Sequence, residues 1–457
     1  MSASERCIIR VAVYQDTIVA ISTPVGEGGI GIVRLSGRDA RPIAQRLFPK
    51  QLVNRRLIYG QVIDPDNGEA IDEVLAAYME APHTYTREDI VEIDCHSGPL
   101  PLQRILGLAL RYGARLANPG EFTLRAFLNG RIDLAQAESV LDVVQAKTQA
   151  GLRLAVQGLG GRLSQQIKEI RSNLIETLAY LTARIDFPED EVEEQDIAQP
   201  LEKVQSALGE LVANADAGMV YRQGVRTVIV GRPNVGKSSI LNRLLRHSRA
   251  IVTPIPGTTR DTLEEVVNLK GVPFVLIDTA GIIDSRDEVE TLAVERSQKA
   301  IEQADFALFV IDASQPLNAA DRELIDFLAE KAVLVAANKC DLPSRAETGE
   351  LPWLRVSTSA LTGEGLTELE NGMVNAVLGG RVVTSDAMLV TNPRHKEALQ
   401  RAERHLAQAG RAIDDSLPDD FITIDIIAAL NALGEITGET ITEDLLDTIF
   451  SRFCIGK

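Results

Sequence analysis

Cysteine, aromatic residues and long apolar runs are scarce in this chain of 457 residues. Its four cysteines form no C-x-x-C pair and no zinc-ligand spacing, which excludes a disulfide scaffold and favours a reducing compartment. Aromatic residues make up 4%. No run of about 18 uncharged apolar residues occurs, so no membrane-spanning helix is predicted. Arg10 and Asp16 interrupt the first apolar stretch, unlike a signal peptide. We expect a cytoplasmic protein that does not engage a membrane.

Basic residues are too few to balance the acidic ones: 47 Lys and Arg stand against 65 Asp and Glu, a net charge of −18. Such a charge repels RNA and anionic membranes. The excess is uneven, because residues 1–131 hold 15 bases and 15 acids, whereas residues 186–196 hold seven carboxylates and no base. If the protein handles nucleic acid, it must use a local patch or a basic partner.

The first 130 residues alternate strand and turn signals, which predicts an α+β domain. Strands are expected at 16–22, 30–35, 58–63, 74–79 and 90–94, and a helix at 102–111. Residues 131–220 have helical periodicity, with one helix over roughly 134–157 and a longer one whose apolar face repeats from Leu163 to Ile185. That face fits a bundle core or a coiled-coil seam, and the bundle core is the preferred interpretation.

Residues 221–381 alternate strands and helices, the pattern of a parallel α/β sheet. Residues 382–457 are helical again, at roughly 394–410, 423–434 and 441–453, and the last helix opens with a capping box from Thr440 to Glu443. So short a helical stretch is small for an independent domain. We expect it to pack on helices of residues 131–215, forming one discontinuous helical domain into which the α/β domain is inserted.

One glycine-rich segment predicts a phosphate-binding loop. A β-branched strand at 227–230 runs into GRPNVGKS, from Gly231 to Ser238, and then into a helical run. In this strand–loop–helix context the glycines let backbone amides wrap the phosphates, Lys237 reaches the β- and γ-phosphates, and Ser238 binds Mg²⁺. The residues assigned to nucleotide binding here are Gly231, Asn234, Val235, Gly236, Lys237, Ser238 and Ser239.

The base is predicted to be guanine. Asn338, Lys339 and Asp341 follow an apolar strand at 333–337, as in GTP-binding domains. In such domains the Asp carboxylate accepts two hydrogen bonds from the guanine edge that adenine cannot supply. Ser359 and Ala360 resemble the companion loop, whose backbone amide reads the guanine oxygen.

Two further segments resemble the switches of a GTPase. Asp278 ends a strand at 274–277 and would hold Mg²⁺ through water, while the amide of Gly281 would sense the γ-phosphate. Thr258 and Thr259 lie in GTTRD, which resembles switch I, with Thr259 as the second Mg²⁺ ligand. Five elements in the right order predict a GTPase.

The glutamine that orients the attacking water in many small GTPases is absent, because Ile282 stands in its place. No arginine finger in cis is evident either. The Asn234 amide oxygen could help hold a K⁺ ion against the phosphates, or Asn234 could be an ordinary loop residue. Glu290 could orient the water, although a solvated helix charge is the simpler interpretation from the residues alone.

Several strings together resemble one family, the tRNA-modification GTPases of the MnmE/TrmE type. They are DTIVAISTPVGEGGIGIVRLSG, NPGEFTLRAFLNGRIDLAQAE, GRPNVGKSS with GTTRD and DTAG, and the terminal FCIGK. The resemblance runs from about residue 16 to the end. The GTPase motifs are shared by many proteins, whereas the N-terminal strings and the cysteine tail are far more specific.

The resemblance implies K⁺-dependent GTP hydrolysis, triggered when two GTPase domains meet across a homodimer. Asn234 falls on the family's K⁺-coordinating asparagine, and switch I would complete the cation loop with Thr253, Ile255 and Thr258. Glu290 falls on the glutamate that orients the water through a bridging water. The resemblance thus favours the functional interpretation of both uncertain residues.

The resemblance also implies a folate-binding and dimerising N-terminal domain. Its contacts to a reduced folate, 5,10-methylene- or 5-formyl-tetrahydrofolate, map onto Arg34, Glu92, Arg131 and Lys457. Cys454 becomes a candidate reactive residue, with a packing role as the alternative. A flavoprotein partner of the MnmG/GidA type would supply FAD in a heterotetramer or larger assembly. Together they would install an aminomethyl-type or carboxymethylaminomethyl group at carbon 5 of the wobble uridine of certain tRNAs.

A second class of function is a GTP-timed assembly factor that docks on ribosomal RNA, as Era-like GTPases do. Such proteins share the hydrophobic residue after D-x-x-G but carry an RNA-binding module beside the GTPase, and none is legible here. A third is a folate-regulated switch without catalysis. Composition and spacing alone lead only to a GTPase with two accessory domains.

Overall fold

The computed structural model describes residues 16–24, 26–187, 193, 195–248, 265–277, 299–346, 351–379 and 390–456. Their contacts divide the chain into two units. The first comprises the described residues up to Leu141 and from Thr437 onward, and the second those from Asp142 to Ile436. No helix within the described ranges is long and apolar enough to cross a bilayer.

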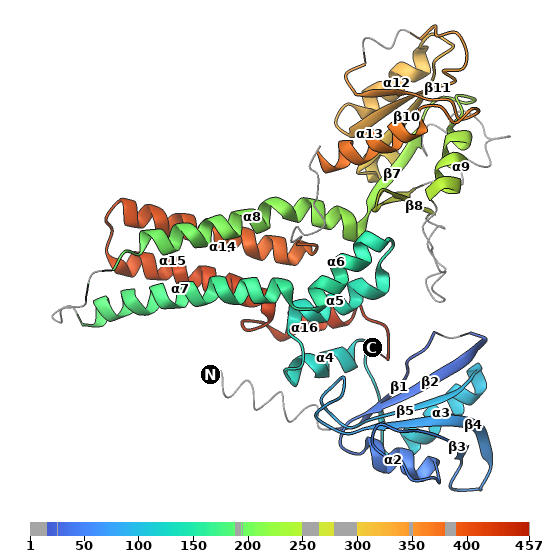
Figure 1. The fold of residues 1–457 in the computed structure, drawn as a ribbon, viewed down its shortest axis with the longest axis vertical. Helices are drawn as coiled ribbons and strands as arrows, with labels where there is room; N and C mark the ends of the chain where they lie inside the picture. The colour runs from blue at the N-terminus through green and yellow to red at the C-terminus, as the bar shows by residue number, and fades with distance from the viewer. Residues whose placement is uncertain are drawn as a thin grey trace. The chain divides into compact units, whose positions relative to one another are not determined.

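A six-stranded mixed sheet forms the centre of the first unit, in the order β3-β4-β5-β2-β1-β6 (Figure 1). Its strands are β1 (Ile18–Ile21), β2 (Gly28–Ser36), β3 (Leu57–Ile63), β4 (Ala70–Met79), β5 (Ile90–Ser97) and β6 (Arg115–Leu116). All neighbours are antiparallel except β1 and β6. Helices α2 (Ala40–Leu47) and α3 (Pro99–Arg111) share one apolar core with the sheet.

The alternation of buried side chains along β2 and β5 explains which face of the sheet is covered by helices. Val33 and Leu35 of β2 are fully buried and pair with Ile93 and Val91 of β5, which are fully buried as well. Residues two apart point to the same side of a strand, so these side chains line the face on which α2 and α3 pack. The strand signals and the helix expected at 102–111 are confirmed.

Three helices form a second cluster in this unit: α4 (Glu121–Leu128), the start of α5 (Leu134–Gln145) and α16 (Glu443–Phe450). Leu124, Leu134 and Phe450 are buried together there. The expected capping box is wrong, because Thr442, rather than Thr440, precedes the first turn and its side chain makes no capping hydrogen bond. This last helix packs against α4 and the start of α5.

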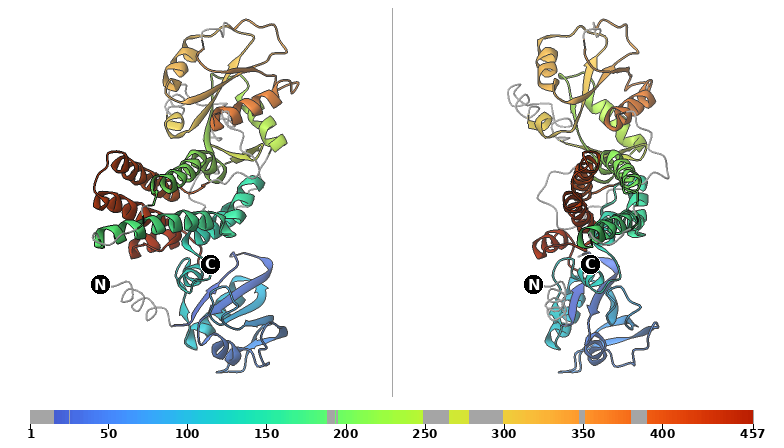
Figure 2. Two further views of the ribbon diagram at one scale, coloured as in Figure 1. Left: turned by 60° about the vertical axis from the view of Figure 1, so that its left-hand side comes forward. Right: turned by 90° about the vertical axis from the view of Figure 1, so that its left-hand side faces the viewer.

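Long helices fill the first part of the second unit: α6 (Gln149–Leu159), α7 (Arg162–Asp186), α8 (Ala198–Gln223), α14 (Pro393–Asp414) and α15 (Asp419–Thr437). The green helices α7 and α8 lie beside the red helices α14 and α15 (Figures 1 and 2). The Gln205 side chain donates to the Leu406 carbonyl, joining α8 to α14, and Arg171 donates to the Leu430 carbonyl, joining α7 to α15. The apolar face of α7 therefore belongs to a bundle core, with Ile167, Leu174 and Leu181 buried.

The prediction of a single helix over 134–157 is wrong, because the helix is interrupted between α5 and α6. Thr148 caps α6 by accepting a hydrogen bond from the Gly151 amide, and its hydroxyl donates to the Gly271 carbonyl. A β-branched residue whose side chain competes for backbone hydrogen bonds favours such a helix start over a helix interior.

A second six-stranded sheet completes this unit, in the order β12-β11-β10-β7-β9-β8. Its strands are β7 (Val225–Val230), β8 (Glu265–Leu269), β9 (Val272–Leu276), β10 (Phe306–Asp312), β11 (Ala332–Asn338) and β12 (Arg355–Ser357). All neighbours are parallel except β8 and β9. Helices α9 (Lys237–Ser248), α12 (Ala319–Leu328) and α13 (Leu366–Leu378) accompany it. The carboxyl ends of β7, β10 and β11 meet at one edge, where ligands bind in such sheets.

Candidate nucleotide-binding site

The loop between β7 and α9 is shaped by two glycines. A Cβ on Gly231 would lie 2.2 Å from the Val310 carbonyl oxygen, and one on Gly236 would lie 2.1 Å from Nδ2 of Asn338. Both have positive φ, 148° and 101°. Only glycine combines this conformation with so close an approach. The loop is therefore held tightly against β10 and β11 by backbone geometry that the sequence encodes locally.

Lys237 lies over this loop at the start of α9. Its Nζ donates to the carbonyl oxygens of Gly231, at 2.7 Å, and Arg232, at 3.0 Å. Desolvation lowers the pKa of Lys237. Backbone carbonyls thus hold the ammonium group in place, and a phosphate would complete the neutralisation of its charge. Ser238 and Ser239 follow in the first turn of the helix, where free amides and the helix dipole favour an anion.

Asn338 joins three segments at the sheet edge. Its side-chain amide donates to the Val235 carbonyl at 2.8 Å, and its Oδ1 accepts from the Ala360 amide at 3.0 Å. Asn338 and Ser359 are buried, whereas Asp341 is exposed beside them. The structure therefore brings together the phosphate loop, the Asn338–Asp341 segment and the Ser359–Ala360 loop, as the sequence predicts. The structure also shows that the Ala360 amide donates a hydrogen bond to the Asn338 side chain.

Asp312 is a residue of this site that sequence reasoning missed. It ends β10, is 3% exposed, and accepts from Nζ of Lys339 at 2.7 Å. Burial raises its pKa, but the hydrogen bonds from Lys339 and Ser314 outweigh that and leave the pKa below its ordinary value. The pair holds Lys339, which has a left-handed φ of 66°. The available signal was an acidic residue at the end of a fully apolar strand.

Seven predicted site residues fall outside the described part of this unit's nucleotide site, and their placement stays a prediction. They are Thr253, Ile255, Thr258, Thr259, Asp278, Gly281 and Glu290. Asn234 is described: it is exposed on the phosphate loop, with a left-handed φ of 64°.

A second group of predicted residues comes together in the first unit. Arg34 donates from Nε to Oε1 of Glu92 at 2.7 Å and from a terminal nitrogen to the Gly456 carbonyl at 3.2 Å. That carbonyl also accepts from the Ser22 hydroxyl, and the Cys454 carbonyl accepts from the Gly120 amide. The end of the chain is thereby held against β1 and β2. Lys457 lies beyond the described residues, and the Cys454 side chain is exposed.

Tyr85 connects Arg131 to this region. The Arg131 guanidinium stacks 4.7 Å from the Tyr85 ring centroid. Burial raises the pKa of Tyr85, whereas its hydrogen bond with Thr123 and the charges of Arg131 and Arg34 act to lower it. The Arg34 guanidinium also lies 5.8 Å from the Phe122 ring. Arginines beside aromatic rings and a fixed chain end can hold a flat anionic ligand.

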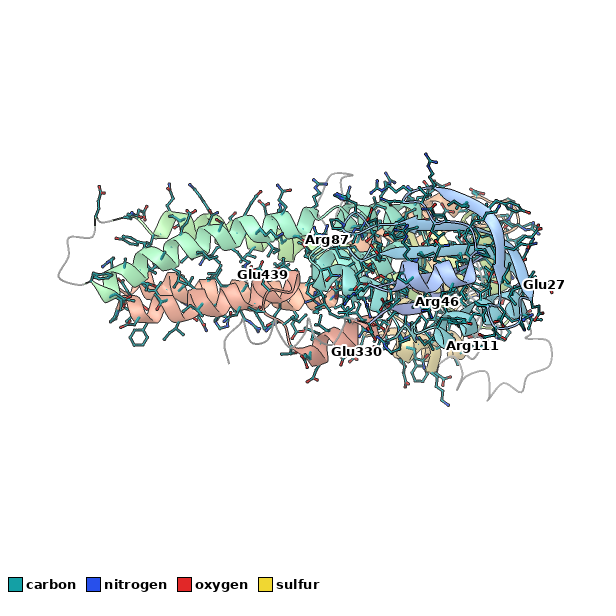
Figure 3. All side chains as sticks on the ribbon, turned by 90° about the horizontal axis from the view of Figure 1, so that it is seen from below. Glu27, Arg46, Arg87, Arg111, Glu330 and Glu439 are labelled. Carbon is teal, nitrogen blue, oxygen red and sulfur yellow. The ribbon has the colours of Figure 1, made fainter. Side chains whose placement is uncertain are left out.

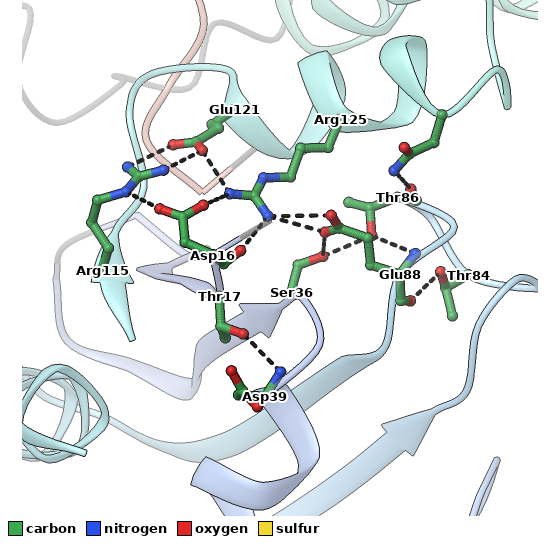
Figure 4. Close-up of polar contacts among 11 residues, drawn as sticks. Asp16, Thr17, Ser36, Asp39, Thr84, Thr86, Glu88, Arg115, Glu121 and Arg125 are labelled. Atoms are coloured by element: carbon green, nitrogen blue, oxygen red, sulfur yellow. Dashed lines mark hydrogen bonds and ion pairs between the residues drawn. The ribbon is translucent and has the colours of Figure 1, made fainter. Parts of the chain in front are cut away.

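A buried ion network supports the same region (Figure 4). Arg125 and Glu121 are each 1% exposed and form an ion pair at 2.9 Å. Arg125 also pairs with Asp16 at 2.6 Å and Glu88 at 3.2 Å, and Arg115 pairs with Glu121 at 2.6 Å. The network ties α4 to the start of β1 and to the segment before β5. Nothing in the sequence pattern pointed to it.

Family comparisons match both parts of the chain. The model described as the MnmE helical domain matches residues 134–454, and the one described as the GTP-binding protein TrmE N-terminus matches residues 17–131. A tRNA modification GTPase MnmE from Chloroflexus aurantiacus is 54% identical over 451 residues, which are 97% of this chain and 100% of that relative. The chain belongs to the MnmE family of tRNA modification GTPases.

Other MnmE relatives are similarly close: one from Roseiflexus sp. is 52% identical over 461 residues, covering 97% of this chain and all of the relative. The G domain of the T. maritima FeoB iron transporter aligns with 33% of this chain and 98% of its own at 26% identity, with a TM-score of 0.24. The assignment rests on the sequence relatives. It confirms the resemblance and the fold class: an N-terminal α+β domain, a discontinuous helical domain and an inserted P-loop GTPase domain.

Proposed function

We propose that this protein hydrolyses GTP as part of a tRNA modification reaction at carbon 5 of the wobble uridine. The observation that carries the GTPase part is the meeting of the phosphate loop, Asn338 and Ala360 at one sheet edge. The tRNA part rests on MnmE relatives that this chain matches along their whole length. The relatives' names state tRNA modification and GTPase activity, and carbon 5 of the wobble uridine is the finer part of this proposal.

Within the nucleotide site we assign phosphate binding to the loop from Gly231 to Ser239, with Lys237 as its positive charge. Asp341 would accept two hydrogen bonds from the guanine edge, and Asn338 would hold its segment in place. Ser238 and Thr259 are the proposed Mg²⁺ ligands, with Asp278 acting through water and Gly281 sensing the γ-phosphate. A bound Mg²⁺ would neutralise charge on the β- and γ-phosphate oxygens.

For hydrolysis we propose a K⁺ ion in place of an arginine finger, held by Asn234 with Thr253, Ile255 and Thr258. The exposed position of Asn234 and its left-handed backbone support this assignment, because its side chain lies at the surface and makes no hydrogen bond to any residue that the structure describes. Glu290 is the proposed residue that orients the attacking water. Hydrolysis would be triggered when the GTPase domains of a homodimer meet.

In the N-terminal domain we propose a reduced-folate site formed by Arg34, Glu92, Arg131 and Lys457. The hydrogen bonds that hold the carbonyls of Cys454 and Gly456 support it, because they fix the end of the described chain beside Arg34. The folate would supply the one-carbon unit. An MnmG/GidA-type flavoprotein would supply FAD and complete a heterotetramer or larger assembly.

The function is tested by measuring modified nucleosides in total tRNA, by mass spectrometry, from cells lacking this gene. We expect the carbon-5 modification of wobble uridine to disappear and to return when the parent gene is restored. An unchanged nucleoside profile would reject the proposal and direct attention to ribosome assembly.

The K⁺ assignment makes a separate prediction. Replacing Asn234 by alanine should abolish the stimulation of GTP hydrolysis by K⁺ over Na⁺, because it removes an amide oxygen from the cation site. The rate is measured with each salt at equal ionic strength. Equal stimulation in variant and parent would show that Asn234 does not bind the cation. Asn318→Ala, which removes the cap of α12, is the matched control and should leave the K⁺ response intact.

A further inference from the structure

A basic segment on the first unit has no role in the sites described above. Residues 38–56 hold six cations and one carboxylate, Asp39, in a chain whose net charge is −18. The six are Arg38, Arg41, Arg46, Lys50, Arg55 and Arg56. They lie just before α2, on α2 and on the loop that leads to β3, and Arg46 is labelled in Figure 3. We call residues 38–56 the basic strip.

The cations of the basic strip differ in their partners from five other arginines of the unit. Those five pair with carboxylates, namely Arg34, Arg104, Arg111, Arg115 and Arg125, whereas Arg87, Arg131 and Arg452 form no ion pair with a described carboxylate. None of the six strip cations forms an ion pair with any carboxylate that the structure describes. Their charges are therefore uncompensated, and binding an anion would break no existing salt bridge.

The strip is nevertheless well ordered by hydrogen bonds to its own backbone. Gln45 donates to the Phe48 and Lys50 carbonyls and accepts from the Leu52 amide. Arg41 donates to the Leu52 carbonyl and lies 4.8 Å from the Tyr78 ring centroid. Because α2 and the loop are tied together, little conformational entropy is lost when the strip binds a ligand.

The chemistry of the strip fits an extended chain of phosphates. Arg38 precedes α2 and Arg46 lies in its last turn, so about 12 Å of helix separates them and one small anion cannot bridge both. Between α2 and the loop lies an open hollow of about 430 Å³ lined by Arg41, Gln45 and Gln51 with two prolines. Guanidinium and amide donors around a hollow suit phosphate and sugar oxygens.

A membrane surface fits less well. A helix that binds a bilayer must present its apolar face to the lipid. The apolar residues of α2, including Ile43 and Leu47, are instead buried against the sheet. One acidic side chain, Glu80, lies at the end of the strip, where its carboxylate accepts a hydrogen bond from Asn54. This confines the attractive surface to α2 and its loop.

We propose that the basic strip is the surface on which this chain contacts the phosphate backbone of tRNA. The inference rests on the proposed function, which names tRNA as the substrate. It explains how a protein with a net charge of −18 engages RNA through its own residues: residues 1–131 have no net charge, and six cations without a described carboxylate partner lie within residues 38–56. Contacts to phosphate position the RNA and carry no base specificity.

The test compares two double variants of the full-length protein. Arg38→Gln with Arg56→Gln removes two exposed strip cations whose side chains form no hydrogen bond or ion pair with a described residue. Arg104→Gln with Arg111→Gln removes the same charge from exposed arginines of the same unit that are paired with Glu69 and Asp66. Binding of fluorescently labelled tRNA is measured from about 50 to about 200 mM KCl, a range over which phosphate contacts weaken strongly.

We expect the strip variant to bind tRNA on the order of tenfold more weakly at the lowest salt. Its plot of log affinity against log salt should be shallower by about 1.5, since each lost phosphate contact removes about 0.7–0.9. The control variant should stay within about twofold of the parent. Equal losses in both variants, or no tRNA binding by the parent at about 50 mM salt, would overturn the inference.

Two further outcomes are informative. Strip-dependent binding to vesicles of phosphatidylglycerol and phosphatidylcholine, without strip-dependent binding to tRNA, would assign the strip to a membrane and reject RNA. Failure of the proposed function is recognised separately, by an unchanged nucleoside profile in cells lacking the gene. If modification requires the gene but the strip variant restores it and binds tRNA like the parent, only the present inference fails.

Discussion

Replacing Lys237 by alanine should lower kcat/KM for GTP hydrolysis by about 100- to 1,000-fold, the cost of removing one preorganised charge stabiliser. Nζ of Lys237 is held by the carbonyl oxygens of Gly231 and Arg232, so its charge is positioned before any nucleotide arrives. The alanine variant loses that charge and leaves both carbonyls without this donor. Steady-state hydrolysis of GTP, with nucleotide affinity measured separately, divides the loss between binding and chemistry.

Lys331 offers a matched control for this change. Its Nζ also donates to two backbone carbonyls, those of Glu302 and Ala304, but it precedes β11 at the opposite edge of the same sheet. Lys331→Ala should therefore remove an equivalent pair of hydrogen bonds while leaving hydrolysis within about threefold of the parent, since surface changes away from the site are small. If the two variants lose activity equally, the effect of Lys237 is structural and the nucleotide assignment is wrong.

Arg125→Met should destabilise the first unit by about 3–5 kcal/mol, because it removes a buried charge that pairs with three carboxylates, one of them, Glu121, as buried as Arg125 itself. Glu121 and Asp16 would keep Arg115 as a partner, whereas Glu88 would lose the arginine with which it pairs. Hydrogen exchange of the peptides covering β1 and α4 in the full-length protein measures the loss locally. We expect opening to become more than about 100-fold easier, at about 1.4 kcal/mol for each factor of ten.

The same variant should show a distinctive pH dependence. Burial raises the pKa of Glu121 and of Asp16, but hydrogen bonds from Arg115 and Arg125 outweigh it, so both pKa values lie below normal. Such carboxylates stabilise the fold above their unfolded pKa, about 4, and lose that contribution as the pH falls through the folded value. The difference between parent and variant should therefore shrink as the pH is lowered below about 4.

An exposed ion pair in the same unit is the control. Arg104 makes two hydrogen bonds to Glu69, at 2.8 and 2.7 Å, but it is 36% exposed. Arg104→Met should cost no more than about 1 kcal/mol, as surface pairs do. A loss of that small size for Arg125→Met would mean that the network contributes specificity rather than stability.

Prediction from sequence succeeded where a binding site is formed by residues that are adjacent in the chain. Gly231, Gly236 and Lys237 are recognisable in order because a phosphate loop is made from consecutive backbone amides, and the glycines that permit its conformation must lie at fixed spacing. Asn338 follows its strand for the same reason. The apolar period of α7 also identified a buried face, since 3.6 residues per turn is a local property.

Prediction from sequence was wrong at two helix starts, which depend on groups distant in the sequence. Thr148 divides the helix expected over 134–157 because its hydroxyl finds a carbonyl partner, Gly271, more than a hundred residues away. Helix α16 begins after Thr442, whereas the sequence predicted a start after Thr440. The packing of Phe450 and Leu446 against α4 decides where that helix begins. Both outcomes depend on partners that a local pattern does not contain.

The amino-acid order alone establishes that this chain carries a phosphate loop, a guanine-type segment and the strings of the MnmE family, because each is a run of adjacent residues. Folding decides which distant groups become partners. It sets Arg34 beside the carbonyl of Gly456, 422 positions away, buries Arg125 among three carboxylates, and gives the cations of the basic strip no ion pair among the described residues. Charge pairing depends on distance and desolvation, and both exist only once the chain has packed.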